Sequence, residues 1–118
     1  MGAPVAFFEI TSKDPSRLIT FYRELFDWTV DESHGPEYSL VDTGAGEDAV
    51  GGGIGAVSDP AGTGGVSVYM RVDDLQASLD RAETLGGTAL VPPTELPDGY
   101  GRFAMFADPD GNSIGLWT

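Results

Sequence analysis

The chain has 118 residues, with 19 aspartates and glutamates against six lysines and arginines, a net charge of −13 and no cysteine. A surface this acidic repels phosphate backbones and anionic lipids, which argues against nucleic-acid and membrane-surface partners and favours cationic ligands. The lack of cysteine excludes disulfides, zinc–thiolate sites and cysteine nucleophiles.

The first residues of the chain, Met1 to Pro4, run directly into a strand-like pattern, without a basic stretch followed by an apolar run. We therefore expect no secretory signal and no membrane-spanning segment, and the cytoplasm is the expected location. The length predicts a single domain.

The first half of the sequence predicts a strand, a helix and three further strands. The first strand covers residues 5–11. Asp14 is typical of a helix N-cap, and Pro15 suits the first helical position because its missing N–H has no partner there. The residues expected to form the buried stripe of this helix are Leu18, Phe21, Tyr22 and Leu25. The extended segments that follow are residues 28–30, 38–42 and 53–57.

The second half repeats this pattern after residues 58–64, whose composition predicts a linker. A strand over residues 65–71 precedes a helix that begins at Asp73 or Asp74 and ends at Gly86. The residues expected on its buried face are Leu75, Leu79, Ala82 and Leu85. The extended segments that follow are residues 88–91, 102–107 and 113–117, the last two joined by a turn over 108–112.

A shift of 60 positions aligns the two halves of the chain. Residues 5–11 then fall on 65–71, Asp14 falls on Asp74, and residues 53–57 fall on 113–117. This internal repeat predicts one domain made of two tandem βαβββ modules, residues 4–57 and 65–118.

Several segments resemble the vicinal oxygen chelate superfamily, which includes glyoxalase I, extradiol dioxygenases, and bleomycin- and fosfomycin-resistance proteins. The segments that carry the resemblance are residues 8–10, 14–17, 21–28, 69–75, 85–87 and 101–117. The resemblance implies an α+β fold whose two modules form a curled, cup-like mixed sheet around a cavity, with the helices outside. It covers nearly the whole chain and is specific for fold rather than for function.

Metal-dependent members of that superfamily take four metal ligands from the first and last strands of the two modules. Carried over to this sequence, those positions fall at Phe7, Gly55, Ser67 and Gly115. Divalent metals prefer imidazole, carboxylate or thiolate donors, so this set predicts no metal and no cofactor. His34, the single histidine, lies in a polar loop and is expected to be solvated.

Strand alternation predicts that Phe7 and Glu9 share one face of the first strand, opposite Phe8 and Ile10. A cavity-facing Glu9 has three possible roles. It would pair with a cationic group of a ligand, act as a general base, or bind a hard ion such as magnesium together with other carboxylates and water.

Without a metal, the resemblance still implies a cavity, which aromatic rings and a few polar groups would line. Gly55 and Gly115 are expected to leave its floor bare, with room for a flat ligand. The residues predicted to line it are Phe7, Glu9, Trp28, Tyr38, Gly55, Ser67, Tyr69, Arg71, Tyr100, Gly115 and Trp117. No catalytic residue is assigned, because a serine triad needs a histidine within reach and His34 is the only one.

Three functions follow from these observations. The first is a metal-free small-molecule-binding protein that resembles bleomycin-resistance proteins and sequesters an aromatic or cationic toxin or antibiotic. The second is an enzyme, either metal-dependent or based on Glu9, that acts as a lyase, isomerase or dioxygenase. The third is a regulatory or structural dimer with a vestigial cavity. A homodimer is expected under all three.

Overall fold

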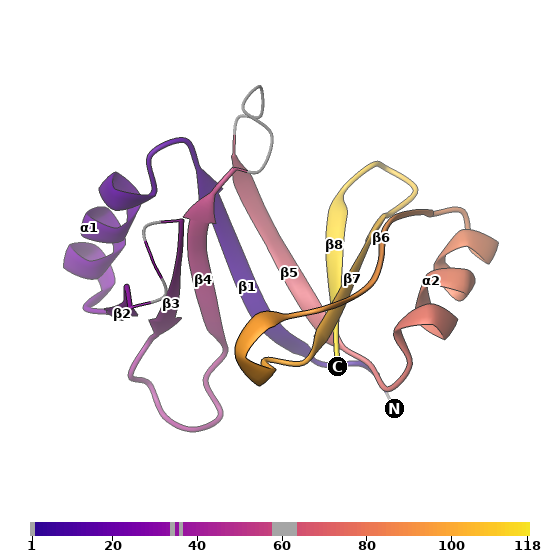
Figure 1. Cartoon of the computed structure of the whole chain (residues 1–118), viewed down its shortest axis with the longest axis horizontal. Coiled ribbons are helices and arrows are strands. Elements are labelled where there is room, and N and C mark those ends of the chain that lie inside the picture. The colour runs from indigo at the N-terminus through magenta and orange to yellow at the C-terminus, as the bar shows by residue number, and fades with distance from the viewer. Residues whose placement is uncertain (1, 34, 36, 58–63) are drawn as a thin grey trace. The chain divides into compact units, whose positions relative to one another are not determined.

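The computed structural model describes residues 2–33, 35, 37–57 and 64–118, so His34 and residues 58–63 of the predicted linker lie outside the described residues. Within these ranges the chain forms two helices of more than one turn and eight strands, in the predicted order of β-α-β-β-β twice over (Figure 1). The fold is therefore mixed α+β, as predicted.

The described chain divides into two compact units. The N-terminal unit lies within Phe7–Val66, and the C-terminal unit consists of Ser67–Thr118 together with the residues before Phe7. The first residues belong to the C-terminal unit because the amide of Arg71 donates a hydrogen bond of 2.9 Å to the carbonyl of Pro4.

The N-terminal unit is a mixed four-stranded sheet with one helix on one face (Figure 1). Its elements are β1 (Val5–Ser12), α1 (Pro15–Phe26), β2 (Thr29–Asp31), β3 (Tyr38–Asp42) and β4 (Gly51–Ala56). The strand order is β2-β3-β4-β1, with β1 parallel to β4 and the other pairs antiparallel. The buried core between helix and sheet consists of Ile10, Ile19, Val41 and Ile54.

Helix α1 begins and ends as its sequence predicts. The carboxylate of Asp14 accepts a hydrogen bond of 3.3 Å from the amide of Arg17, and Pro15 follows at the first helical position. The predicted buried stripe is partly wrong, because Phe21 and Leu25 are 55% and 57% exposed. The helix packs on the sheet through the buried Ile19 together with Leu18 and Tyr22, which belong to the predicted stripe.

The C-terminal unit repeats this topology. Its elements are β5 (Gly65–Arg71), α2 (Leu75–Thr84), β6 (Thr88–Glu95), β7 (Arg102–Ala107) and β8 (Ser113–Trp117), with a short 3-10 turn at Pro97–Gly99. The strand order is β5-β8-β7-β6, with β5 parallel to β8 and the other pairs antiparallel. The buried core consists of Leu75, Leu79, Ala104 and Leu116.

Helix α2 is capped by Asp74, whose carboxylate accepts a hydrogen bond of 3.0 Å from the amide of Ala77. Leu75 and Leu79 are buried, as predicted. Leu85 was expected beside them, but it follows the last helical residue and is 63% exposed.

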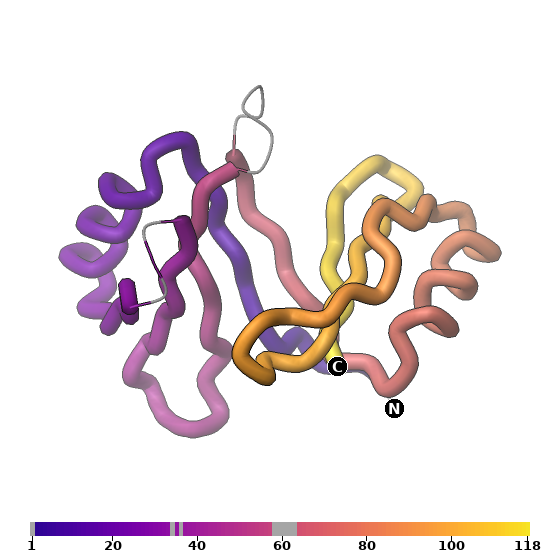
Figure 2. The backbone as a smooth tube through the Cα atoms, in the orientation of Figure 1, coloured from indigo at the N-terminus to yellow at the C-terminus, as the bar shows by residue number. Residues whose placement is uncertain are grey.

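Strand β6 is longer than predicted and includes Pro92 and Pro93, which the sequence placed in a loop. It lies at the edge of the strand order of its unit, where proline costs no ladder hydrogen bond, and its pairing with β7 contains register shifts. The following segment returns to the end of β8, where the amide of Thr118 donates to the carbonyl of Arg102 at 3.0 Å (orange and yellow in Figure 2).

The turn between β7 and β8 confirms the prediction for residues 108–112. The Asp108 carboxylate accepts hydrogen bonds of 2.9 Å from the Asn112 side chain and from the amides of Asp110 and Asn112. Gly111 has a φ of +89°, which favours glycine. The Asn112 side chain, followed by the backbone amides, holds the pKa of Asp108 below its ordinary value of 3.8.

Candidate functional site

In each unit, one face of the sheet packs against a helix and the other carries most of the residues predicted to bind a ligand. We call this second surface the helix-free face. In the N-terminal unit, Phe8 and Ile10 pack into the core under α1. Glu9 alternates with them and so lies on the helix-free face, together with Phe7, as the strand pattern predicts.

A carboxylate and a phenol meet on the helix-free face of the N-terminal unit. The Tyr38 hydroxyl donates a hydrogen bond of 2.8 Å to Glu9 Oε2, and both side chains are half-buried. The two residues come from β3 and β1, with β4 between them. The hydrogen bond fixes the carboxylate in one orientation on this face.

The ring of Tyr38 spans β4 because the intervening residues on that face are glycines. A Cβ built on Gly53 would overlap the Tyr38 hydroxyl, and a Cβ on Gly55 would overlap its ring. The expectation that Gly55 leaves bare space for a flat ligand is therefore wrong, since Tyr38 occupies that space. Glycine is required here for the close approach of the ring to the backbone.

Trp28 does not join this group. Its ring lies on the helix-covered face, with centroid distances of 5.4 Å to Phe8, 5.4 Å to Tyr22 and 5.2 Å to Phe26. The sequence placed Trp28 at the mouth of a cavity. The period-two pattern it shares with Val30, which packs against the same core, indicates the observed side.

The helix-free face of the C-terminal unit carries Ser67, Tyr69 and Arg71 from β5, as predicted. The Arg71 guanidinium carbon lies 4.4 Å from the centroid of the Trp117 ring, a cation–π contact. The Trp117 indole N–H donates a hydrogen bond of 2.8 Å to the carbonyl of Tyr100, which fixes the ring on which Arg71 rests. Ser67 donates to the carbonyl of Ser113 at 3.2 Å.

Gly115 stands under a ring, as Gly55 does. A Cβ on Gly115 would overlap the ring of Tyr69, which is only 8% exposed and whose hydroxyl points to Met105 Sδ at 4.0 Å. The expected bare floor at Gly115 is therefore also wrong. Tyr100 contacts Trp117 through its backbone carbonyl, a contact that no side-chain pattern indicates.

The strand registers change the mapping of the repeat. Glu9 lies opposite Gly53 in one unit, whereas Tyr69 lies opposite Gly115 in the other. With the first strands aligned at an offset of 60, the equivalent of Gly115 is thus Gly53, not Gly55. Gly53 was not among the predicted site residues, although glycines at alternate positions of β4 indicate a close approach of another group to this strand.

The residues at the positions that the resemblance assigns to metal ligands do not fit a divalent metal. Phe7, Gly55, Gly115 and the register-corrected Gly53 offer no side-chain donor, and the Ser67 hydroxyl is a weak one. Within the part of the chain that the structure describes, no three His, Cys, Asp or Glu residues gather as metal ligands would. Among the same residues, neither helix has the length and apolar character needed to cross a membrane.

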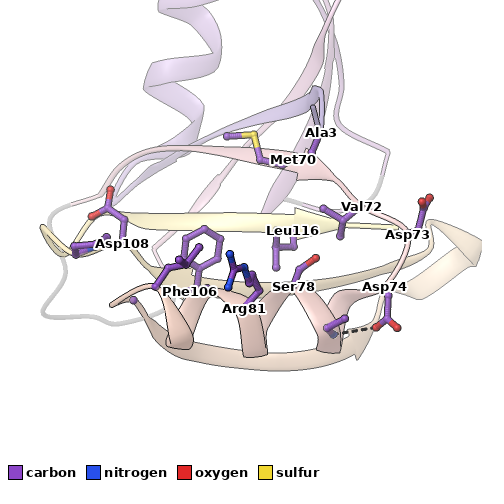
Figure 3. Close-up of a pocket in the computed structure, with 15 residues that line it drawn as sticks. Ala3, Met70, Val72, Asp73, Asp74, Ser78, Arg81, Phe106, Asp108 and Leu116 are labelled. Atoms are coloured by element: carbon purple, nitrogen blue, oxygen red, sulfur yellow. Dashed lines mark hydrogen bonds between the residues drawn. The ribbon is translucent and has the colours of Figure 1, made fainter. Parts of the chain in front are cut away.

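The helix-covered face of the C-terminal unit contains a feature that the sequence did not reveal. A groove with a volume of about 690 Å³ runs between α2 and the sheet (Figure 3). Its sheet side includes Met70, Phe106 and Leu116, and Arg81 extends over it from α2. None of the eleven predicted ligand-binding residues lines this groove.

The chain is similar in sequence to the anthracycline biosynthesis protein DnrV of Streptomyces peucetius, with 30% identity over 130 aligned positions that cover 98% of this chain and 46% of that protein. The chain thus spans about half the length of the curated relatives it matches. Its fold is similar to that of a glyoxalase/bleomycin resistance protein/dioxygenase superfamily member from Vibrio splendidus 12B01, with a TM-score of 0.65, 15% identity, and coverage of 98% and 97% of the two chains.

A second solved structure of similar fold is the methylmalonyl-CoA epimerase of Mycobacterium tuberculosis, with a TM-score of 0.69, 17% identity, and coverage of 96% of this chain and 85% of that one. The sequence model of the family described as a glyoxalase-like domain matches residues 7–117, almost the whole chain. The chain therefore belongs to the glyoxalase-like domain family, within the vicinal oxygen chelate superfamily.

Proposed function

We propose that this glyoxalase-like domain binds a small molecule without a metal, and that the ligand is aromatic, cationic or both. The observation that carries the proposal is the Glu9–Tyr38 pair, a half-buried carboxylate held at 2.8 Å by a phenol on the sheet face opposite α1. An oriented carboxylate attracts a cationic group, and the edge of the adjoining aromatic ring offers an apolar surface.

The donor set supports the metal-free part of the proposal. The positions that hold ligands in metal-dependent relatives are occupied here by phenylalanine, glycine and serine, and Tyr38 and Tyr69 cover the glycines. The aromatic part is supported by the Arg71–Trp117 stack on the other unit and by the name of the Streptomyces peucetius relative, since anthracyclines are fused-ring aromatic molecules.

The biological role that we propose is sequestration of such a molecule as a toxin or antibiotic. The net charge of −13 supports a cationic ligand, because it raises the local concentration of cations around the chain.

The test is a calorimetric titration with an anthracycline that carries an amino sugar, with anthraquinone-2-sulfonate as a flat anion of similar ring size. We expect binding of the cation alone, weakened at least tenfold by Glu9→Gln. Glu24→Gln is the matched control, because it removes the same charge from an exposed position of α1. Equal affinity of Glu9→Gln and the unmodified chain would contradict the proposal.

Metal content provides an independent test. The purified chain is incubated with zinc, nickel, manganese, iron(II) and magnesium, desalted and analysed by mass spectrometry. We expect no retained metal. Near-stoichiometric metal would contradict the metal-free proposal and would make Glu9 the first residue to replace.

A second candidate function is acid–base catalysis by Glu9, in a lyase or isomerase. The same 2.8 Å hydrogen bond favours it, because the phenol holds the Glu9 carboxylate in one orientation, as a general base requires. Turnover of a carbonyl substrate that Glu9→Gln abolishes, with ligand affinity retained, would distinguish catalysis from binding.

We also propose that the chain forms a homodimer. A second copy would supply the length by which the curated relatives exceed this chain. Light scattering should then give a mass of twice 12.4 kDa. A monomeric mass at micromolar concentration would contradict this.

A further inference from the structure

The groove beneath α2 arises from the way the helix sits on its sheet. Helix α2 packs mainly against β6 and β7. On the same face, Met70 of β5 is only partly covered, and together with Phe106 and the buried Leu116 it forms the apolar floor of the groove. A volume of about 690 Å³ lies within the range of about 300–1,000 Å³ typical of small-molecule pockets.

The wall formed by α2 consists mostly of small side chains. Ala77 and Ser78 are adjacent, and Ser78 lies four residues before Ala82, so all three line the groove from the helix. Because these side chains are short, they leave the floor accessible from the helix side. Arg81 is the one long side chain among them, and Figure 3 shows it in the middle of the groove beside Phe106 and Leu116.

Arg81 supplies the positive charge in the lining of the groove. Among the described residues, no carboxylate lies within ion-pair distance of its guanidinium and no acceptor takes a hydrogen bond from it. A guanidinium stays charged at any physiological pH and presents several donors in a plane that matches a carboxylate. A guanidinium over an apolar floor is a recognition group for an apolar anion.

The aspartates at the ends of the groove do not reverse this preference. The Asp74 carboxylate caps α2, and the Asp108 carboxylate accepts three hydrogen bonds within its own turn. Asp73 stands at the far end, beyond Val72, and its carboxylate is drawn turned away from the floor (Figure 3). The two engaged carboxylates are thus less available to a cation than Arg81 is to an anion.

We propose that this groove is a second binding site, which takes an apolar molecule bearing one carboxylate. The apolar body lies on Met70, Phe106 and Leu116, and the carboxylate accepts paired hydrogen bonds from Arg81. The site lies on the helix-covered face of the C-terminal unit, so it shares no residue with the Glu9–Tyr38 pair. Its ligand differs in charge from the one proposed for that pair.

The experiment is calorimetric titration of the intact chain with decanoate and with naphthalene-2-carboxylate, each below the concentration at which it self-associates. Decylammonium serves as the cation of matched chain length. We expect at least one of the two carboxylates to bind with one-to-one stoichiometry, and the better ligand shows whether a linear or an aromatic acid fits. Decylammonium is expected to bind at least tenfold more weakly.

Two variants locate the site. Arg81→Gln should weaken carboxylate binding at least tenfold, whereas Arg102→Gln, which removes the same charge from an exposed position of the same unit, should change it less than twofold. Ala77→Phe, at an exposed helix position on the groove wall, should block binding without removing a charge. Amide chemical shifts of Phe106 and Leu116 should move on titration and stay unchanged in Ala77→Phe.

Three results would overturn the proposal. They are undiminished carboxylate binding by Arg81→Gln, equal affinity for decylammonium, and no binding of either carboxylate. Glu9→Gln separates this site from the proposed function, because it should weaken binding of the cationic aromatic ligand at least tenfold and leave carboxylate binding unchanged. Loss of carboxylate binding in Glu9→Gln would count against a separate site.

Discussion

The helix-covered faces of the two units have the same topology and opposite contents. In the N-terminal unit, the rings of Phe8, Tyr22 and Trp28 pack against the core between α1 and the sheet, and the half-exposed Phe26 ring borders them, at centroid distances of 5.2 to 6.0 Å. In the C-terminal unit, Leu75 and Leu79 of α2 pack on the sheet, whereas Ala77, Ser78 and Ala82 of the same helix line a groove of about 690 Å³ beside that core. The two units share one strand order, so the volumes of the side chains between helix and sheet account for the difference in packing.

The largest predicted effect compares phenylalanines at these two faces. Phe8→Ala should lower the free energy of unfolding by about 3 kcal/mol, because it leaves a cavity among the packed rings. Phe106→Ala should cost about 1 kcal/mol less, because the Phe106 ring already borders an open groove and leaves no enclosed void. Urea denaturation followed by circular dichroism measures both. Equal losses would mean that the groove is closed in solution.

The second effect compares the glycines beneath the two tyrosines. Gly115→Ala should destabilise the chain by about 2 kcal/mol, because the new Cβ meets the buried ring of Tyr69. Gly53→Ala should cost about 1 kcal/mol, because the half-buried Tyr38 can turn toward solvent and loses mainly its hydrogen bond.

Gly65→Ala is the control for both glycine variants, because a Cβ at Gly65 has no neighbour within 4 Å and the backbone is not in the left-handed region. It should change the free energy of unfolding by less than about 0.5 kcal/mol. A smaller loss for Gly115→Ala than for Gly53→Ala would contradict the difference in burial between the two tyrosines.

The third effect compares the hydroxyls of the same tyrosines. Tyr38→Phe removes a 2.8 Å hydrogen bond to the Glu9 carboxylate and should cost about 1 kcal/mol. Tyr69→Phe removes a 4.0 Å contact to a thioether sulfur and should cost less than about 0.5 kcal/mol, since sulfur is a weak acceptor. Thermal denaturation of the two variants in parallel measures the difference, and a larger loss for Tyr69→Phe would refute it.

The smallest effect concerns the turn of the C-terminal unit. The hydrogen bonds from Asn112 lower the pKa of Asp108 below 3.8 in the folded state, so they stabilise the fold above that pH. This contribution is lost as the pH falls through the lowered pKa of the folded state. Asn112→Ala should therefore lower the melting temperature slightly at neutral pH and leave it unchanged in strong acid.

Asp110→Asn is the control for this variant, because it changes the charge of the same turn and removes no donor to Asp108. A difference in melting temperature between Asn112→Ala and the unmodified chain that persisted in strong acid would show that Asn112 stabilises the turn independently of the Asp108 charge.

Much of the fold could be predicted from local chemistry. Asp14 and Asp74 mark helix starts because an aspartate before a helical pattern can cap it, and the turn at Asp108 follows from its proline and glycine. Period-two alternation was enough to place Glu9 opposite the core. These features depend on residues close together in the chain, so a single sequence contains them.

Which side chains meet at the site depends on the register between neighbouring strands, and this register could not be predicted from the sequence. Tyr38 covers Gly53 and Gly55 only because β3 pairs with β4 at one alignment, and Tyr69 covers Gly115 for the same reason. The groove escaped prediction because its floor and its wall come from strands and a helix whose packing offset no local pattern encodes. The position of the Trp28 ring on the helix-covered face could have been predicted, because Val30 has the same parity in the strand and packs against the same core.

The ring that rests on Gly115 also constrains how this sequence can change. Gly115 is a position where the resemblance implies a metal ligand, and any ligating side chain placed there begins with a Cβ that overlaps Tyr69. Shortening Tyr69 alone would leave a void in its place, so each single step is unfavourable and only the pair of changes is tolerated. The effects of the two substitutions on stability are therefore not additive. Introducing a metal ligand at this position would therefore take two coordinated substitutions rather than one.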